Sequence, residues 1–263
     1  MPELPEVETV CRGLAPVLEG RRIDRLTLRR KDLRIPFPKD LKARAEGRKV
    51  ERIFRKAKYI VMALDSGDAL IAHLGMSGRM QVMKAGAPLE LHDHVIFATG
   101  EGVEVRFNDP RRFGLLTVTR LADLDTHKLF KHLGPDPLDA EFTPDALAAA
   151  LKGRKTSIKV ALLDQRIVVG VGNIYASESL HLAGISPKRF LQFLTKERAL
   201  AELREGSTVM QAAHSAGLSG SGRLHDLLIT WESMTPGEAR LGGEGLTLRW
   251  GWALTPVGWG LAA

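Results

Sequence analysis

The chain has 263 residues, of which 44% are hydrophobic and 26% are charged, as in ordinary globular domains. It has no basic segment followed by an apolar run at its N-terminus and no uninterrupted apolar stretch of about 18 residues, so we expect a cytoplasmic protein with no membrane partner. The single cysteine, Cys11, excludes an internal disulfide and a multi-cysteine zinc site, and the net charge of +7 favours a polyanionic partner.

The first residues carry a candidate nucleophile. Removal of Met1 would leave Pro2 with a free secondary amine, and α-amino groups have a reference pKa of roughly 7.7 to 8, so a usable fraction is unprotonated at neutral pH. Attack of this amine on a sugar aldehyde carbon would give an iminium ion, which is an electron sink for elimination. Glu3 is placed to exchange protons beside it. The alternative is an ordinary N-terminus whose acidic residues complement a helix dipole.

A helix is predicted from Pro5 to Glu19, with Gly20 at its C-terminal cap. Apolar residues recur along it at helical spacing, namely Val7, Val10, Leu14, Val17 and Leu18. Cys11 lies within this helix and is expected to be a packed thiol rather than a reactive one.

Short apolar runs separated by Gly, Asp and Pro turns follow between Arg22 and Val118. The clearest runs cover residues 60–64, 69–74, 94–98 and 103–107. This pattern predicts an antiparallel β-sandwich or flattened barrel after the N-terminal helix, and with the helices that follow it the fold class is α+β.

Three turns of this β-rich region, 56–59, 73–78 and 109–114, carry unusual side chains. Met76, Arg111 and Phe113 would suit a wedge that enters duplex DNA and fills the space left by an extruded base. Taken singly, the turns have plainer interpretations: solvated lysines, a core methionine and ordinary Asp-Pro turn chemistry.

Two histidines, His92 and His94, fall on one face of a predicted strand. This spacing raises the question of a metal site. No further ligand is evident, so phosphate contact or packing is favoured.

The chain becomes helical from about Phe142, with helices predicted at 144–151, 159–163 and 173–182. A glycine-rich loop precedes the last helix. Its Gly170 and Gly172 allow close approach of a backbone, and Asn173 offers a side chain and free amides to a phosphate. Basic residues in the segment 152–159 are suited to grip the same strand.

Together these motifs resemble the formamidopyrimidine-DNA glycosylases, the base-excision enzymes for oxidised purines, over residues 1 to about 200. The resemblance is carried by Pro2-Glu3-Leu4-Pro5-Glu6, Ala57-Lys58-Tyr59, His73-Leu74-Gly75-Met76-Ser77-Gly78, Asp109-Pro110-Arg111-Arg112-Phe113-Gly114 and Val169-Gly170-Val171-Gly172-Asn173-Ile174-Tyr175-Ala176-Ser177-Glu178. It implies damaged double-stranded DNA as the partner. Endonuclease VIII, the sister family, usually has Gly where Leu4 stands here.

Carried over by position, the resemblance implies roles for individual residues. Pro2 would be the Schiff-base nucleophile, Glu3 the acid/base, and Lys58 a basic group that assists β-elimination and contacts phosphate. The remaining positions divide into a lesion-pocket set of Glu6, Lys159 and Glu178, a void-filling set of Met76, Arg111 and Phe113, and a DNA-backbone set of His92, Arg154 and Asn173.

The resemblance is expected to end near Leu200, because the family's lesion-capping loop and four-cysteine zinc finger have no counterpart. We therefore expect no zinc and no other cofactor. The apolar spacing within residues 208–230, with Gly217 at the turn, predicts a helix-turn-helix. Together with the residues up to Arg249, they resemble the adaptive-response protein that joins such a module, of the arabinose-regulator type, to a methylguanine methyltransferase. A coincidental pair of helices is the alternative, and the missing catalytic cysteine excludes methyl transfer.

The sequence thus predicts four segments: a β-sandwich glycosylase domain at 1–130, a helix-two-turn-helix domain at 131–200, a helix-turn-helix-like segment at 201–245 and a truncated tail at 246–263. The predicted function is a monomeric DNA-repair glycosylase that removes formamidopyrimidine and 8-oxoguanine and has lyase activity at abasic sites. The alternative is a catalytically impaired DNA-binding chimera that keeps the site residues but cannot close on a lesion.

Overall fold

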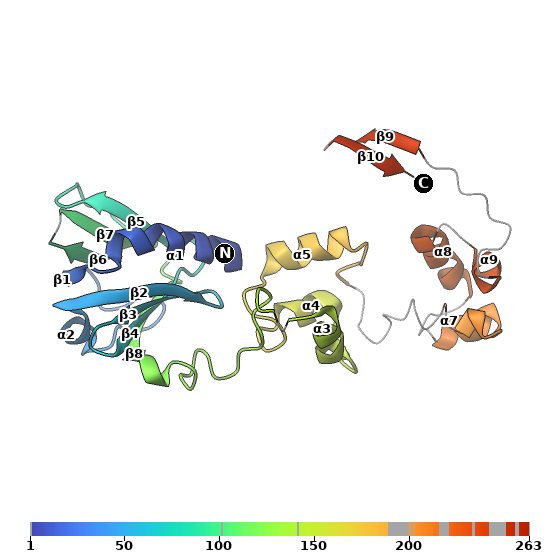
Figure 1. The fold of residues 1–263 in the computed structure, drawn as a ribbon, viewed down its shortest axis with the longest axis horizontal. Coiled ribbons are helices and arrows are strands. Elements are labelled where there is room, and N and C mark those ends of the chain that lie inside the picture. The colour runs from blue at the N-terminus through green and yellow to red at the C-terminus, as the bar shows by residue number, and fades with distance from the viewer. Residues whose placement is uncertain are drawn as a thin grey trace. The chain divides into compact units, whose positions relative to one another are not determined.

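The structure, a computed structural model, describes residues 2–100, 102–140, 142–188, 200, 202–215, 221–232, 235–241, 251–255 and 258–262 (Figure 1). The chain divides into two compact units. One comprises Met1–Leu151 and Lys159–Leu182, and the other comprises Lys152–Ile158 and Ala183–Ala263. Among the described residues, no helix is long and apolar enough to cross a membrane.

The N-terminal helix, α1 (Leu4–Leu18), begins and ends within one residue of the predicted boundaries, Pro5 and Glu19. Its buried side chains are Leu4, Val7, Cys11, Leu14 and Leu18, which lie on one face at steps of three and four residues. The Cys11 side chain is 4% exposed, and burial raises the pKa of its thiol to about 12. The prediction of a packed, unreactive thiol is confirmed.

Eight antiparallel strands follow α1: β1 (Arg22–Leu28), β2 (Arg48–Lys56), β3 (Tyr59–Leu64), β4 (Asp68–His73), β5 (Arg79–Lys84), β6 (Asp93–Thr99), β7 (Val103–Asn108) and β8 (Leu115–Arg120). A short helix, α2 (Leu41–Ala45), separates β1 from β2. The strand order is β5-β7-β6-β1-β2-β3-β4-β8. The β1–β2 ladder consists of the pairs Arg22↔Lys49 and Ile23↔Arg48, so the sheet divides at this short junction into two four-stranded halves.

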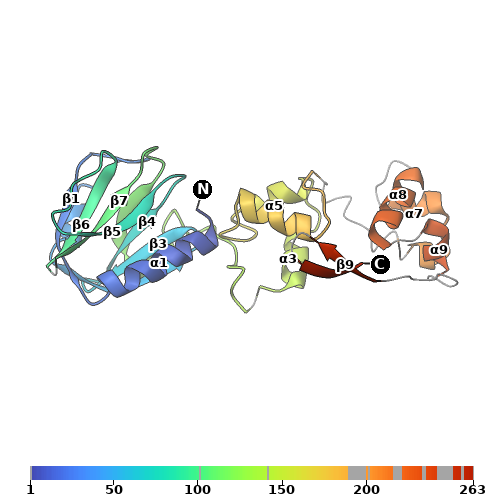
Figure 2. The ribbon, with the colours of Figure 1, turned by 90° about the horizontal axis from the view of Figure 1, so that it is seen from above.

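The two halves enclose one hydrophobic core, as the predicted β-sandwich requires. Phe97 and Phe107 contribute from one half, and Met62 and Leu70 contribute from the other. The helix α1 adds its apolar face to the same core and packs against β2, β3 and β5 (Figure 2). The residues just before α1 are therefore held by a fully packed element.

The strands β3 and β4 are buried on both faces because the segment after β8 covers their outer face. This segment begins with the 3₁₀ helix η1 (Leu121–Asp123). Its side chains Leu124 and Phe130 pack with Val61 of β3 and Ile71 of β4. The covering segment leads from the sandwich toward the helices that follow.

Three helices follow this segment: α3 (Pro144–Leu151), α4 (Ile158–Leu163) and α5 (Asn173–Leu182). Each agrees within one residue with a helix predicted from the sequence. The glycine-rich loop lies between α4 and α5, and Gly170 within it has a φ of +81°. A side chain at this position would be strained, which explains the glycine.

The second unit contains α7 (Val209–Ser215), α8 (Ser221–Glu232), α9 (Pro236–Arg240) and a hairpin of β9 (Gly251–Thr255) and β10 (Gly258–Ala262). Its small core consists of Leu203, Ala212, Ala213, Leu224, Leu228 and Ala239. The two predicted helices of the helix-turn-helix are present, and the predicted turn residue Gly217 lies outside the described residues. The hairpin was not predicted, because we treated these residues as a truncated tail.

Candidate active site at the amino terminus

The carboxylate of Glu3 is buried at the amino-terminal end of α5. The residue is 1% exposed. Its Oε2 accepts hydrogen bonds from the backbone amides of Gly172 at 2.6 Å and Tyr175 at 3.2 Å, and its Oε1 accepts one from Ile174 at 2.8 Å. The first amides of a helix have no acceptor within the helix, and the positive end of the helix dipole favours an anion. A residue at the start of the chain therefore caps a helix that begins at residue 173.

Two glycines make this close approach possible. A Cβ on Gly172 would lie 2.5 Å from Glu3 Oε1, and a Cβ on Gly170 would lie 2.6 Å from Leu4 Cδ1. The Leu4 amide also donates to the Gly170 carbonyl at 3.0 Å. A close approach at these glycines is present, and the side chains of Glu3 and Leu4 make it. The prediction that the start of this helix offers free amides to a phosphate is wrong for residues 172, 174 and 175, because Glu3 accepts their hydrogen bonds.

Pro2 is half-buried and directly precedes the buried carboxylate. The next peptide is fixed, because the Glu3 amide donates to Glu6 Oε2 at 2.9 Å. The exposed Glu6 also accepts a hydrogen bond from the Tyr175 hydroxyl at 3.3 Å on Oε1. Glu6 thus joins the start of α1 to α5, and the candidate nucleophile directly precedes the residue whose carboxylate caps α5 and whose amide Glu6 accepts.

Lys58 lies in the two-residue turn between β2 and β3. Its Nζ donates to the Val171 carbonyl at 2.8 Å, and the residue is 7% exposed. Burial lowers the pKa of Lys58, and the nearby Glu3 carboxylate opposes this shift. The preceding Ala57 has a φ of 53°, which is uncommon for a residue with a Cβ. The turn therefore presents a partly desolvated lysine, a suitable proton acceptor, toward the Glu3 carboxylate.

Gln165 organises the loop between α4 and α5 and was missed in the sequence. Its Nε2 donates to the Leu163 carbonyl at 3.1 Å and to the Val171 carbonyl at 2.9 Å, and its Oε1 accepts from the Gly170 amide at 2.9 Å. Gln165 and Lys58 thus share the Val171 carbonyl as an acceptor. The available signal was an amide side chain, which both donates and accepts, next to two glycines.

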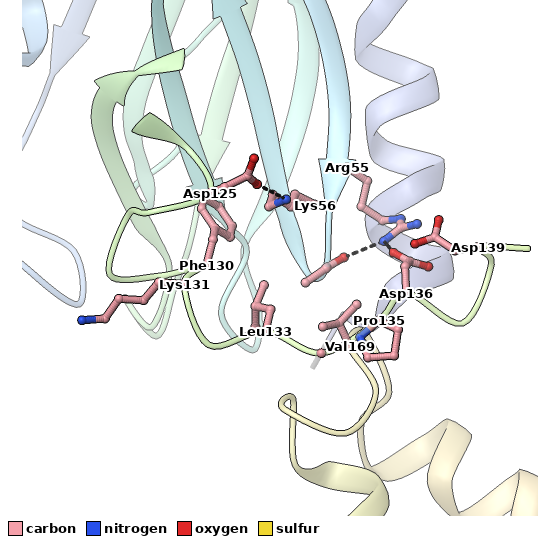
Figure 3. Close-up of a pocket in the computed structure, with 12 residues that line it drawn as sticks. Arg55, Lys56, Asp125, Phe130, Lys131, Leu133, Pro135, Asp136, Asp139 and Val169 are labelled. Carbon is pink, nitrogen blue, oxygen red and sulfur yellow. Dashed lines mark hydrogen bonds and ion pairs between the residues drawn. The ribbon is translucent and has the colours of Figure 1, made fainter. Parts of the chain in front are cut away.

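Arg55 was also missed, because it lies just before the turn 56–59 and outside every motif considered in the sequence. Its side chain is 8% exposed and joins three parts of the unit (Figure 3). The guanidinium donates to Glu8 of α1 at 3.2 Å, to the Ala57 carbonyl at 3.1 Å and to Asp136 after β8 at 2.6 Å. These contacts connect the helix behind Pro2, the turn that carries Lys58 and the segment that leads to the helices.

A second ion pair holds the same turn from its other side. Lys56 Nζ lies 2.7 Å from Asp125 Oδ1 and 5.8 Å from the centre of the Phe130 ring. Figure 3 shows both ion pairs in the wall of a cavity of about 520 Å³ beside the turn. The Asp125 side chain is 85% exposed, so the buried contacts of Arg55 are the stronger support for the Lys58 turn.

The three predicted wedge residues lie on two turns that touch each other. Met76 is 43% exposed, Phe113 is 49% exposed, and Arg111 is exposed as well. A Cβ on Gly75 would lie 2.6 Å from the Phe113 carbonyl oxygen, so the two backbones are in direct contact. The structure brings these side chains together at the surface of the sandwich.

The other predicted residues are distributed more widely. Around α5, the Lys159 amino group donates to Ser177 Oγ at 2.9 Å, while Glu178 and Asn173 are exposed. His92 is half-buried, and its ring centre lies 6.0 Å from that of His94. Within the part of the chain that the structure describes, no three His, Cys, Asp or Glu side chains gather where they could hold a metal ion. Arg154 falls in the other compact unit.

The structure thus places a buried carboxylate directly after Pro2 and a desolvated lysine against the same loop that binds this carboxylate. Two family descriptions match the chain: Formamidopyrimidine-DNA glycosylase N-terminal domain over residues 1–116 and Formamidopyrimidine-DNA glycosylase H2TH domain over residues 133–223. The formamidopyrimidine-DNA glycosylase of Ruegeria pomeroyi is 48% identical over 227 residues, which cover 82% of this chain and 80% of the relative.

Solved structures agree. A structure of Lactococcus lactis Fpg with DNA containing N7-benzyl-Fapy-dG aligns with a TM-score of 0.69 at 27% identity and covers 94% of this chain and 82% of the other. The Fpg protein of Thermus thermophilus aligns with a TM-score of 0.65 at 33% identity and covers 94% and 79%. The chain belongs to the formamidopyrimidine-DNA glycosylase family. The H2TH match continues past residue 200, where we predicted the resemblance to end.

Proposed function

We propose that this chain removes oxidised purines, formamidopyrimidine and 8-oxoguanine, from damaged double-stranded DNA and then cleaves the strand through a Schiff base on Pro2. Its family is one of base-excision repair glycosylases. One observation carries the assignment of the site: the Glu3 carboxylate, next to Pro2, is held by three amides at the start of α5, while Lys58 is desolvated against the same loop.

The proposed reaction begins when the Pro2 nitrogen attacks C1′ of the damaged nucleotide. The glycosidic bond breaks, and the base leaves with a proton from an acid at the site. The nitrogen loses its proton, O4′ takes one as the sugar ring opens, and an iminium ion forms between the nitrogen and C1′. A base then removes a C2′ proton, the electron pair forms the C2′–C3′ double bond, and the 3′ phosphate departs. Hydrolysis of the iminium ion releases the unsaturated sugar aldehyde and restores the amine.

Glu3 and Lys58 are suited to the two proton transfers of this reaction. Glu3 exchanges a proton with the sugar oxygen or the departing base, because its carboxylate is fixed beside the nucleophile. Lys58 accepts the C2′ proton, since burial lowers its pKa toward the working range of a base. In this proposal Glu6, Lys159 and Glu178, which belong to α1 and to the surroundings of α5, line the lesion pocket.

The DNA contacts are proposed from exposure and charge. Met76, Arg111 and Phe113 fill the space that the extruded base leaves, as exposed side chains on tight turns can do. His92, Arg154 and Asn173 contact the backbone of the DNA, and the net charge of +7 favours the polyanion. We propose that the protein acts as a monomer in the cytoplasm, without zinc or another cofactor.

The test is borohydride trapping on a duplex that contains 8-oxoguanine. Processed protein is expected to give a covalent adduct, Pro2→Gly to give less of it, and a retained N-terminal tag to abolish it, while the same tag at the C-terminus serves as the matched control. An adduct that survives the N-terminal tag would point to a lysine nucleophile. No adduct from untagged protein that still binds the duplex would identify a DNA-binding chimera without lyase activity.

A further inference from the structure

Asp109, which the sequence presents as an ordinary turn residue, is fully buried at 0% exposure between the two wedge turns. Its Oδ1 accepts a hydrogen bond from Ser77 Oγ at 2.9 Å, and its Oδ2 accepts one from the Gly114 amide at 2.7 Å. Ser77 directly follows Met76, and Gly114 directly follows Phe113. One carboxylate therefore ties both turns at the positions next to their exposed apolar side chains.

The Asp109 backbone is itself fixed to neighbouring residues. Its amide donates to the His92 carbonyl at 3.0 Å, and its carbonyl lies 3.0 Å from His94 Nε2. Arg112, inside the turn, has a φ of 58°, a conformation that costs energy for a residue with a Cβ. The amide of Arg112 donates to the Asp109 carbonyl at 3.2 Å, so the anchored aspartate also holds this strained turn in place.

We propose that Asp109 is a positioning residue, which holds Met76 and Phe113 at a fixed separation so that both enter the duplex together. The proposal rests on the proposed wedge function of these two side chains. Exposed side chains on two independent turns would each lose conformational freedom when they insert into DNA. Because both turns are bound to one buried carboxylate, part of this conformational entropy is already lost before the protein binds DNA. The loss of either hydrogen bond to Asp109 should therefore slow lesion processing more than it weakens nonspecific binding.

The test uses Ser77→Ala, Met76→Ala and the double variant, because Ser77→Ala removes the Oγ that donates to Asp109 and accepts the Arg111 amide at 3.3 Å, and it keeps the buried carboxylate. The readouts are the single-turnover excision rate on 8-oxoguanine duplex, the affinity for undamaged duplex and the melting temperature. We expect Ser77→Ala to slow excision about tenfold, as a misplaced group does, with the affinity for undamaged duplex unchanged. The melting temperature should fall, because Asp109 Oδ1 loses its donor, so excision is measured well below it. In the Met76→Ala background, Ser77→Ala should have no further effect. The matched control is Ser66→Ala, which removes a Ser66–Asp68 hydrogen bond of 3.2 Å from another turn of the sandwich.

Two results would overturn the proposal. An equal effect of Ser77→Ala with and without Met76 would show that the link does not act through the wedge. Normal excision by both Met76→Ala and Phe113→Ala would instead remove the wedge function itself. Asp109→Ala adds a second measurement, since it removes the acceptors of both links at once, and it should slow excision at least as much as Ser77→Ala at temperatures where it remains folded.

Discussion

The Glu3 carboxylate accepts the Gly172 amide at 2.6 Å, although 169 residues separate the two in sequence. A Cβ on Gly172 would occupy the space of the carboxylate, so Gly172→Ala must displace Glu3 from the end of α5. We predict a lower melting temperature and a loss of borohydride-trapped adduct for this variant. Thermal unfolding and trapping on the same preparations measure both effects.

Gly13→Ala is the matched control for this substitution. Gly13 is exposed within α1, and a Cβ there meets nothing within 4 Å. An alanine in a helix interior is more favourable than glycine by roughly 1 kcal/mol, so this variant should be slightly more stable and fully active. Similar behaviour of the two variants would contradict the requirement for glycine at residue 172.

Arg55→Lys tests whether the hydrogen bonds of Arg55 to Glu8, Ala57 and Asp136 hold the Lys58 turn in place. A guanidinium reaches three acceptors from one planar group, whereas an ammonium acts as a single compact charge. The substitution leaves at least one buried acceptor without a donor, and we expect it to destabilise the protein by about 1–3 kcal/mol and to slow β-elimination. Urea unfolding and single-turnover cleavage of an abasic-site duplex measure these effects.

Arg12→Lys is the control for Arg55, because it shares the partner Glu8. The Arg12 side chain is 79% exposed, and its Nε lies 2.8 Å from Glu8 Oε1. An exposed pair of this kind contributes about 0–1 kcal/mol, so the control should be nearly neutral. If Arg55→Lys changed the free energy of unfolding as little as Arg12→Lys, the contacts of Arg55 would have no role in holding the turn.

His73 makes stability depend on pH. Burial, with repulsion from Arg34 and Lys58, lowers its pKa to about 4, and its neutral Nδ1 accepts the Gly75 amide at 3.0 Å. In the unfolded chain this histidine becomes protonated near pH 6.5, whereas in the folded chain it stays neutral until about pH 4. Between these two values the unfolded state binds more protons, so the free energy of unfolding falls as pH falls. The total loss is on the order of 3 kcal/mol. Urea unfolding across the window measures the loss.

His73→Asn provides the comparison, since an asparagine oxygen can accept the Gly75 amide and does not titrate. The stability of this variant should fall less steeply over the same pH range. Parallel curves for the two proteins would assign the pH dependence to other groups.

The single cysteine leads to a prediction about metal. One thiol cannot build the four-cysteine finger of the family, so purified protein should contain no stoichiometric zinc, and chelators should leave its lyase activity unchanged. Elemental analysis against protein concentration checks the first statement, and cleavage assays with and without chelator check the second. One zinc per chain would overturn the argument.

The cleavage ends test the prediction that this protein has no four-cysteine finger; the family resemblance implies that the terminal arginine of such a finger assists δ-elimination. We expect products that stop mainly at β-elimination, which gel analysis of the ends resolves. Truncation after Leu200 removes the tail together with the last part of the matched H2TH region, residues 201–223. It should weaken binding without changing sequence preference, and each lost phosphate contact should lower the log-log salt slope by roughly 0.9. Dominant δ-elimination, or loss of recognition of one particular sequence, would contradict this account of the tail.

Local patterns in the sequence predicted the elements well. The spacing of Val7, Leu14 and Leu18 predicted α1, because burial of one helix face repeats at every turn. The contacts that build the site leave no such periodic trace. The bonds of Glu3 to α5 and of Arg55 to Asp136 join residues that are far apart in sequence, so neither could be predicted from local spacing.

The motifs named several residues that the structure brings together. Pro2 and Glu3 were predicted from the chemistry of an N-terminal amine and Lys58 from the family resemblance, and in the structure Glu3 and Lys58 both contact the loop before α5. Asp109 was interpreted as turn chemistry, since Asp before Pro explains a turn by itself. Its buried hydrogen bonds to Ser77 and Gly114 appear only when two separate turns meet.

The capping of α5 by Glu3 also sets the moment at which a newly made chain can act. Synthesis runs from the N-terminus, so the residues of the sandwich, complete at Arg120, leave the ribosome before the amides at 172, 174 and 175 exist. Until those residues emerge, Glu3 has no helix end to cap, and Lys58 has no carbonyl of Val171 to contact. An unfinished polypeptide therefore carries Pro2 without the arrangement of Glu3 and Lys58 that the proposed reaction requires.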